Sequence, residues 1–229
     1  MSDVILKTSH LTKEFKGFTA VSDVNLSVRR GSIHALIGPN GAGKTTCFNL
    51  LTKFLVPTSG TIHFNGHDIT HEQPAQIARR GVIRSFQISA VFPHLTLMEN
   101  VRLGLQRRLG TSYHFWRSQS SLNQLNGRAL ELLAEVGLED LADEVTVNLP
   151  YGRKRALEIA TTLAMKVSAG RTILMVEHNM KVIATIADCI TVLQRGAVLA
   201  EGPYEEVSKN PQVMEAYMGT TDGQLQGAH

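Results

Sequence analysis

The stretch that decides the fold reads Gly38-Pro39-Asn40-Gly41-Ala42-Gly43-Lys44-Thr45-Thr46. It fits the pattern G-x-x-x-x-G-K-[ST], in which glycines let the backbone bend around a phosphate chain and turn its N–H groups inward. A short apolar run, residues 33–37, precedes it, and residues 47–51 continue it as a helix. This strand–loop–helix order predicts a nucleoside triphosphate site at a helix N-terminus, where the helix dipole favours negative charge.

Two side chains of the loop have predicted roles of their own. Lys44 is expected to reach the β and γ phosphates, and the Thr45 hydroxyl is expected to complete the shell of a Mg²⁺ ion. The alternative is an ordinary glycine-rich turn ahead of a helix. All fixed positions of the pattern are occupied, so we interpret residues 38–46 as the nucleotide-binding segment.

Composition and charge are those of a globular protein. The 229 residues, 43% hydrophobic and 19% charged, suit one large α/β domain, or a core with an inserted subdomain. The net charge of +3 comes with basic residues in short groups, so no nucleic-acid partner is predicted. Neither a signal peptide nor an apolar run of about 20 residues is apparent, and a cytoplasmic protein is expected.

The two cysteines lie far apart in the sequence, at Cys47 and Cys189. Two buried thiols in a reducing compartment are the favoured interpretation, and a disulfide is left open.

Hydrophobic periodicity predicts a β-rich first part. Apolar and polar residues alternate over residues 4–30, with a turn at Lys16-Gly17, which indicates a small antiparallel layer. Val24, Leu26 and Val28 are expected on one half-buried strand of this layer. Further strands are expected at residues 61–64, 82–86 and 172–176, and the apolar run 172–176 is of the kind found in buried parallel strands. A hairpin is expected over residues 190–199, with its turn at Arg195-Gly196.

The pattern changes to helices between residues 88 and 164. Thr96-x-x-Glu99 matches a capping box and opens one helix. A second helix, residues 122–136, is expected to have Leu130, Leu133 and Val136 on one apolar face, and a third begins near Gly152, after Pro150.

The order of these motifs resembles ABC-type ATPases over nearly the whole chain, through Gly219. The finer resemblance is to ATP-binding subunits of bacterial branched-chain amino-acid uptake systems. It is carried by residues 37–46, 92–96, 99–101, 149–152, 176–180 and 215–219. It implies an α/β fold: a P-loop NTPase core with a mainly parallel sheet, an N-terminal antiparallel β-layer and an inserted α-helical subdomain.

The resemblance also implies a division of the chain. A single ABC ATPase domain would cover residues 1–229. Residues 1–87 and 165–219 would form the RecA-like core with its β-layer, residues 88–164 the helical subdomain with the signature loop, and residues 220–229 a flexible tail.

Several site residues follow from the resemblance, residue by residue. Phe15 matches the aromatic residue that stacks on adenine, although on its own it reads as β-layer packing. Gln87 matches the glutamine that ligates Mg²⁺ and follows movements of the membrane subunits. His178 matches the switch histidine at the γ-phosphate, at the carboxyl edge of the parallel sheet, where ligands bind.

The signature loop departs from the family pattern. Leu149-Pro150-Tyr151-Gly152-Arg153 takes the place of the family's Leu-Ser-Gly-Gly-Gln, and only Leu149 and Gly152 keep its general form. This loop is expected to close over the γ-phosphate held by the other subunit of a dimer. Pro150 supplies neither a hydroxyl nor an N–H, so the serine contact is lost.

A catalytic strand is missing from the sequence. In the family an apolar strand ends in Asp-Glu-Pro, whose Asp supports Mg²⁺ and whose Glu polarises the attacking water. Here Ala164 runs directly into residues 165–170, which look like the end of the following helix, and Asp143-Glu144 lies before the signature helix. A strand-plus-helix unit, roughly thirty residues, is absent. Because that strand would be internal to the sheet, such a deletion should fold poorly, and we expect the native polypeptide to contain the segment.

These expectations define a function and its alternatives. The first is an ATP-binding, ATP-hydrolysing subunit of a bacterial importer on the inner face of the cell membrane. Branched-chain amino acids are its expected cargo. Its partners would be a second copy or a paralogous ATPase, membrane permease subunits and, indirectly, an extracytoplasmic solute-binding protein. The alternatives are a nucleotide-binding module without hydrolysis, and a non-transport ABC protein of ribosomes or DNA, which usually has tandem cassettes or long insertions.

Overall fold

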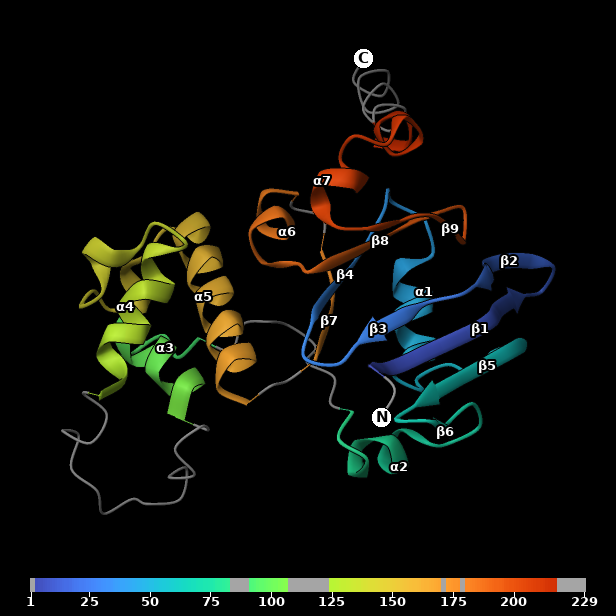
Figure 1. Ribbon diagram of the computed structural model, residues 1–229, viewed down its shortest axis with the longest axis horizontal. Helices are drawn as coiled ribbons and strands as arrows, with labels where there is room; N and C mark the ends of the chain where they lie inside the picture. Colours follow the sequence, from blue (N-terminus) through green and yellow to red (C-terminus); the bar gives the residue numbers. More distant parts are fainter. Residues whose placement is uncertain (1–2, 83–90, 107–123, 170–171, 178–179, 218–229) are drawn as a thin grey trace. The chain divides into compact units, whose positions relative to one another are not determined.

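The computed structural model describes residues 3–82, 91–106, 124–169, 172–177 and 180–217 (Figure 1). The chain divides into two compact units. Unit 1 comprises Met1–Arg84 and Thr172–His229, and unit 2 comprises Ser85–Arg171. Unit 2 is therefore an insertion in the sequence of unit 1.

An antiparallel layer opens unit 1, as predicted. Its strands are β1 (Val4–Phe15), β2 (Phe18–Val24), β3 (Ser27–Arg29), β5 (Ser59–Phe64) and β6 (His67–Asp68). They are ordered β2-β1-β5-β6, and β3 pairs with β1. The single strand expected through Val24, Leu26 and Val28 is interrupted between β2 and β3, although all three side chains are buried as predicted.

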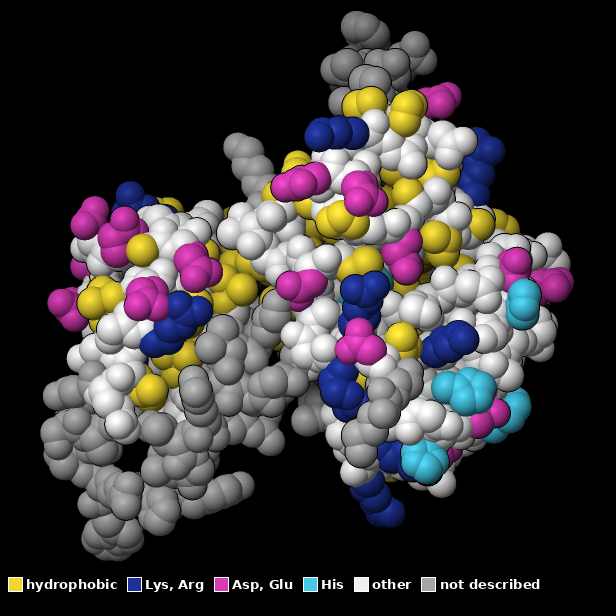
Figure 2. Space-filling model, in the orientation of Figure 1, with side chains coloured by type: hydrophobic (Ala, Val, Ile, Leu, Met, Phe, Trp, Pro, Cys, Tyr) yellow, Lys and Arg dark blue, Asp and Glu magenta, His cyan; other side chains and the backbone are white. Residues whose placement is uncertain are grey.

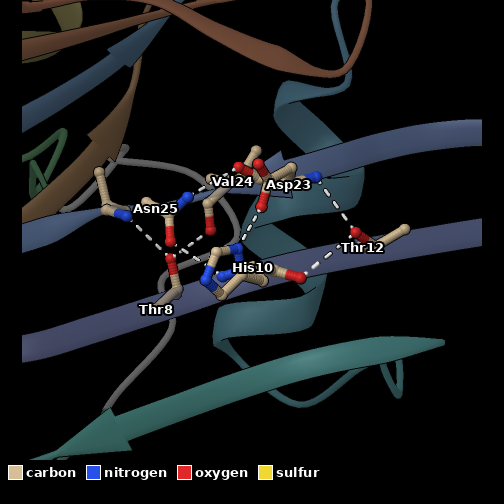
Figure 3. Close-up of polar contacts among 7 residues, drawn as sticks. Thr8, His10, Thr12, Asp23, Val24 and Asn25 are labelled. Atoms are coloured by element: carbon tan, nitrogen blue, oxygen red, sulfur yellow. Dashed lines mark hydrogen bonds and ion pairs between the residues drawn. The ribbon is translucent and has the colours of Figure 1, made fainter.

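A local change of backbone conformation explains this interruption. His10 in β1 and Asp23 in β2 both have left-handed backbone angles, with φ of 51° and 52°. Side chains hold the distortion (Figure 3): His10 Nδ1 lies 2.7 Å from Asp23 Oδ1, and the His10 N–H donates to Asn25 Oδ1 at 2.9 Å. The Asp23 N–H donates to Thr12 Oγ1 at 3.1 Å. Periodicity alone does not show such a network.

The second sheet of unit 1 is mainly parallel. It contains β4 (Ile33–Ile37), β7 (Ile173–Val176), β8 (Cys189–Gln194) and β9 (Ala197–Gly202), in the order β7-β4-β8-β9. β4 is parallel to both β7 and β8, and all five of its residues are buried. The predicted β8–β9 hairpin is confirmed, with Arg195 and Gly196 at its turn.

Within the described part of the chain, β7 is an edge strand that pairs with β4 alone. The sequence predicted a fully buried parallel strand here. The parallel pairing is confirmed, but full burial is wrong, because only Met175 is buried and Ile173, Leu174 and Val176 are half-buried. An apolar strand of this composition is typical of a sheet interior, with a neighbour on each side.

The core of unit 1 lies around the helix that follows β4. This helix, α1 (Lys44–Leu51), buries Cys47, Leu50 and Leu51 in a cluster with residues of both sheets. Members from the sheets include Leu11, Val21, Leu36, Ile62 and Leu193. Each large aliphatic side chain buried in this way contributes about 1.5–3 kcal/mol to folding. The unit is completed by α2 (Pro74–Arg79), α6 (Met180–Ile186), α7 (Tyr204–Val207) and a helical segment at 211–217.

Both cysteines are free thiols, which excludes the disulfide left open by the sequence. Cys47 is buried, and burial raises the pKa of its thiol to about 12. Cys189 is only half-buried, so the expectation of two buried thiols is wrong for this residue.

Unit 2 is helical in its described part, with α3 (Leu97–Gln106), α4 (Asn126–Ala134), short 3-10 turns at Glu139–Leu141 and Thr146–Asn148, and α5 (Tyr151–Ala169). The capping box of α3 is confirmed: the Thr96 N–H donates to Glu99 Oε2 at 2.8 Å, and the Glu99 N–H donates to Thr96 Oγ1 at 3.1 Å. In the described part of the chain, no helix has the length and apolar composition needed to cross a bilayer.

The apolar face predicted for α4 is buried only in part. Leu133 is buried, whereas Leu130 is 40% exposed and Val136 is half-buried. The buried set is Ala129, Leu132 and Leu133, at the spacing of one helix face. α5 starts after Pro150 as predicted and continues without interruption through Ala169, so residues 165–169 extend the same helix.

Candidate functional site

The phosphate-binding loop lies where the sequence predicts it. β4 ends at Ile37, residues 38–43 form the loop, and α1 starts at Lys44. β4 is flanked by β7 and β8 in parallel, so the loop emerges at the carboxyl edge of three parallel strands. Ligands of open α/β sheets bind at this edge.

Two glycines of the loop are required by the fold itself. Gly38 has a φ of 146°, and a Cβ there would lie 2.1 Å from the Leu193 carbonyl oxygen. Gly43 has a φ of 95°, and a Cβ there would lie 2.4 Å from the Ala20 carbonyl oxygen. The sequence explained these glycines by the approach of a phosphate. The structure adds that neighbouring backbone leaves no room for a side chain, even without a ligand.

The β8–β9 turn braces the loop. The Gly196 N–H donates to the Ala42 carbonyl at 3.1 Å, and the Gly196 carbonyl accepts the Ser22 N–H at 2.8 Å. A Cβ at Gly196 would lie 2.9 Å from the Ala20 carbonyl oxygen. The turn thus joins the loop to β2. Sequence reasoning identified Arg195-Gly196 only as a hairpin turn.

The N-terminus of α1 is available to an anion. Gly43 is its N-cap residue, no side chain caps it, and its first turn carries no acidic residue. The first described intrahelical bond of this end runs from the Cys47 N–H to the Gly43 carbonyl. The preceding N–H groups and the helix dipole therefore favour a negatively charged ligand here.

Lys44 is folded back on its own loop. Its ammonium donates to the Gly38 carbonyl at 2.6 Å and to the Pro39 carbonyl at 2.8 Å, and burial lowers its pKa. A phosphate oxygen is a stronger partner for an ammonium than a carbonyl, because the hydrogen bond is then assisted by charge on both sides. The Thr45 side chain is exposed beside it.

Two further residues reach this region, and sequence reasoning missed both. Tyr217, at the end of the helical segment 211–217, has a buried hydroxyl; burial raises its pKa, and a hydrogen bond with the Gly38 backbone opposes this. Glu177 is 2% exposed and follows Val176, which pairs with Leu36 near the end of β4. Their positions depend on the tertiary fold, and neither belongs to the loop pattern.

Phe15 lies at the tip of the β1–β2 hairpin, opposite Phe18, and is 41% exposed. β2 then passes the loop at Ala20, whose carbonyl faces Gly43. Phe18 at the hairpin tip and Ala20 beside the loop are two residues apart on β2. A strand rises about 3.3 Å per residue, so the tip lies near the loop. The Phe15 side chain is thus partly open to solvent.

The signature loop belongs to unit 2. Leu149 is buried, whereas Pro150, Tyr151, Gly152 and Arg153 are exposed, with Tyr151 at 85%. The Pro150 carbonyl accepts the Arg153 N–H at 3.0 Å, which starts α5. The exposed part is thus a helix N-terminus, the kind of surface that favours an anion.

Asn100 fixes the segment that precedes this loop. Its side-chain amide donates to the Phe92 and Thr96 carbonyls and to Thr146 Oγ1, at 3.1, 2.9 and 3.0 Å. Its side-chain oxygen accepts the Phe92 N–H at 2.6 Å. Asn100 is 2% exposed, so it holds the turn before Leu149 in place from the interior of unit 2.

Two predicted site residues, Gln87 and His178, lie outside the described residues, as do Met218 and Gly219. Of the strand expected at residues 82–86, only Val82 is described, and the structure assigns it to no strand. On the face shown in Figure 2, basic and acidic side chains are interspersed over the described part of the chain.

Two family profiles match the chain. One, described as ABC transporter, covers residues 21–169, and another, described as branched-chain amino acid ATP-binding cassette transporter, covers residues 197–223. The chain is also similar to two solved structures of ABC transporter cassettes. One is nucleotide-free; it is 25% identical to this chain, has a TM-score of 0.59, and the match covers 93% of this chain and 98% of that chain. The other is in its ADP conformation; it is 25% identical, has a TM-score of 0.61, and the match covers 95% of this chain and 100% of that chain.

Curated relatives match the chain almost from end to end. It is 36% identical to BraF of Pseudomonas aeruginosa and to LivG of Escherichia coli K12, both named high-affinity branched-chain amino acid transport ATP-binding proteins, over 96% of this chain and 99% of each relative. A protein of Archaeoglobus fulgidus named probable branched-chain amino acid transport ATP-binding protein LivG is 30% identical, over 97% of this chain and 98% of that relative. Because a family profile covers well over half of the chain and these relatives match nearly all of it, the chain belongs to the ABC transporter family, as an ATP-binding cassette of the ABC ATPase type.

Proposed function

We propose that this cassette binds and hydrolyses ATP to energise an importer of branched-chain amino acids. The observation that carries the proposal is the complete phosphate-binding loop at the uncapped N-terminus of α1, with Lys44 placed on the loop's own carbonyls. The names of the relatives support the class of cargo. Selectivity itself would reside in the permease and the solute-binding protein.

Each group of site residues has its own proposed role in nucleotide binding and hydrolysis. The loop backbone, residues 38–46, and Lys44 bind the phosphates and stabilise charge on the transferred phosphoryl group. Phe15 stacks on the adenine, and His178 contacts the γ-phosphate. Residues 149–153 of one subunit close over the ATP of its partner through the N-terminus of α5.

The loop also fits a magnesium ion. Thr45 is exposed at the start of α1, and its hydroxyl oxygen is a donor of the kind that Mg²⁺ prefers; Gln87 would supply a second oxygen. When bound, the ion would neutralise charge on the β and γ phosphate oxygens. Thr45 then orients this end of the nucleotide relative to Lys44.

In the assembly, unit 1 is the nucleotide-binding core with its β-layer, and unit 2 is the helical subdomain with the signature loop. Two copies, or this chain and a paralogous ATPase, would sandwich two ATP molecules against permease subunits at the inner face of the cell membrane. Closure of the dimer would switch the permease between its two states.

Replacing the loop lysine tests the proposal. Lys44→Ala is expected to abolish Mg²⁺-dependent phosphate release, because it removes the cation at the phosphates. Phosphate release is measured on the full chain, with Lys16→Ala, a lysine outside the loop, as the matched control. Unchanged turnover in Lys44→Ala would refute the proposed catalytic site.

A second candidate is a cassette that binds ATP without hydrolysing it. No Asp-Glu-Pro occurs in the sequence, and β7 is an edge strand among the described residues. The alignments with BraF and LivG extend over 256 positions, more than the 229 residues of this chain, so both relatives contain residues without a counterpart here. We propose that some of these residues belong after Ala164, where α5 continues through Ala169 and the strand expected from the family does not follow.

Intact mass and phosphate release separate the two candidates. A mass of 25.1 kDa, together with ATP binding and no phosphate release, would select the binding module. A heavier native chain with a tryptic peptide containing Asp-Glu-Pro would select the complete ATPase.

A further inference from the structure

One lysine is held against the aromatic side chain at the hairpin tip. Lys13 Nζ lies 5.1 Å from the centroid of the Phe15 ring. The same ammonium donates to the Val56 carbonyl at 2.8 Å, in the segment that follows α1. Lys13 is half-buried, so its charge is partly withdrawn from water at this contact.

An irregular hairpin explains this position. The β1–β2 register shifts on both sides of Lys13, between Leu11 and Lys13 and between Lys13 and Glu14. The network in Figure 3, which includes Thr12 and Asp23, fixes the distortion just before it. Bulges of this kind redirect side chains next to functional sites.

A second set of contacts joins the same segment to the loop after α1. The Glu14 N–H donates to Thr58 Oγ1 at 3.0 Å, and the Thr58 N–H donates to the Thr12 carbonyl at 2.9 Å. The Lys13 ammonium thus contacts the Val56 carbonyl in the segment after α1 on one side and the Phe15 ring on the other.

We propose that Lys13 is a positioning residue for the nucleobase, holding and polarising the Phe15 ring on which the base of a bound nucleoside triphosphate stacks. A cation over one face of an aromatic ring is attracted by the electrons of that face. Phe15 keeps 41% of its surface exposed, which leaves room for a base on the ring. Fixing the ring in advance reduces the ordering that binding requires. The inference rests on the proposed function, because it presumes a bound nucleotide.

The test compares two ligands that differ by the base. Isothermal titration calorimetry measures ATP and inorganic tripolyphosphate, each with Mg²⁺, on the full chain and on Lys13→Met, Lys13→Gln and Lys13→Arg. Met removes both the charge and the donor, Gln keeps a donor without the charge, and Arg keeps the cation. Lys16→Met, at the turn of the same hairpin, is the matched control for a lost positive charge.

Lys13→Met and Lys13→Gln are expected to weaken ATP binding about two- to five-fold, the size of an exposed cation–π contact. Tripolyphosphate affinity stays unchanged, which also shows that the phosphate loop of each variant is folded. Lys13→Arg retains wild-type affinity for both ligands, and so does Lys16→Met.

Three outcomes would overturn the inference: unchanged ATP affinity in Lys13→Met, equal weakening of ATP and tripolyphosphate, or an equal loss in Lys16→Met. Failure of the wild-type chain to bind either ligand is a different result. It would contradict the proposed function itself.

Discussion

At the scale of single residues, the phosphate loop shows which features a sequence pattern can predict and which it cannot. The pattern located Gly38, Gly43 and Lys44, because their roles follow from local backbone geometry. It could not indicate that the Leu193 and Ala20 carbonyls close off the two glycines, since these contacts join segments far apart in the chain. Lys13 and Tyr217 were missed for the same reason.

Two loop substitutions test the closeness of these contacts. Gly43→Ala is expected to lower the free energy of unfolding by about 1–3 kcal/mol or more, because its Cβ would clash with the Ala20 carbonyl and strain the backbone. Gly41→Ala is the control: it shares a positive φ of 78°, but no atom lies within 4 Å of its Cβ. Urea denaturation without nucleotide measures both. Equal losses would show that backbone conformation alone matters.

A buried histidine should make stability depend on pH. His34 in β4 is 1% exposed, and burial lowers its pKa from 6.5 to about 4. Thr191 donates its hydroxyl proton to Glu201 Oε2 at 2.6 Å, so His34 Nε2, 2.7 Å from the same hydroxyl, is the donor in that contact. The histidine is therefore neutral and fixed in one tautomer.

The direction of the effect follows from this pKa. Below pH 6.5 His34 binds a proton in the unfolded chain, whereas in the folded chain it stays neutral down to about pH 4. The free energy of unfolding therefore falls as the pH decreases across that window. The loss at pH 5 is about 2 kcal/mol relative to pH 8. Thermal unfolding of the wild type and of His34→Gln measures it. The variant should show a flatter profile, and an identical slope would exclude His34 as the cause.

At the scale of elements, regular periodicity predicted the existence of most helices and strands, and interactions between elements decided the details. The β1–β2 hairpin and the β8–β9 hairpin were foreseen from their turns. The interruption after Val24 was not, because left-handed Asp23 is stabilised by side chains from β1. On α4, periodicity predicted a hydrophobic face, but the packing of unit 2 buries Leu132 and Leu133 and leaves Leu130 exposed.

This choice on α4 gives a paired prediction. Leu133→Ala should lower the free energy of unfolding by about 2–5 kcal/mol, because it opens a cavity at a fully buried position. Leu130→Ala, on the same helix but 40% exposed, should change it by no more than about 1 kcal/mol. Chemical denaturation distinguishes the pair. A loss for Leu130→Ala as large as that for Leu133→Ala would favour the face predicted from sequence, which contains both residues.

At the scale of the whole molecule, two observations fit the proposal that a strand-plus-helix segment is missing: β7 is an edge strand among the described residues, and no Asp-Glu-Pro occurs in the sequence. The apolar composition of β7 fits a strand with neighbours on both sides, yet its described pairing is with β4 alone. The sequence predicts a gap at this point because the family order of motifs is fixed. It could not indicate how the remaining chain responds, which is that α5 continues through Ala169.

Restoring the segment is the experiment at this scale. Inserting the strand-plus-helix segment of a relative between Ala164 and Met165 should pair β7 on its free side and cover Ile173, Leu174 and Val176. Burial of these side chains adds about 2 kcal/mol, which raises the Tm of a chain of this size by about 4–8 °C. The insertion also brings the carboxylates suited to supporting Mg²⁺ and polarising water, so Mg²⁺-dependent phosphate release should rise above that of the chain without the insert. An insert whose Asp-Glu-Pro glutamate is changed to glutamine is the matched control: it should raise the Tm equally without this rise in phosphate release. If neither insert stabilises the chain, β7 does not need the strand, and the gap is a native feature of this cassette.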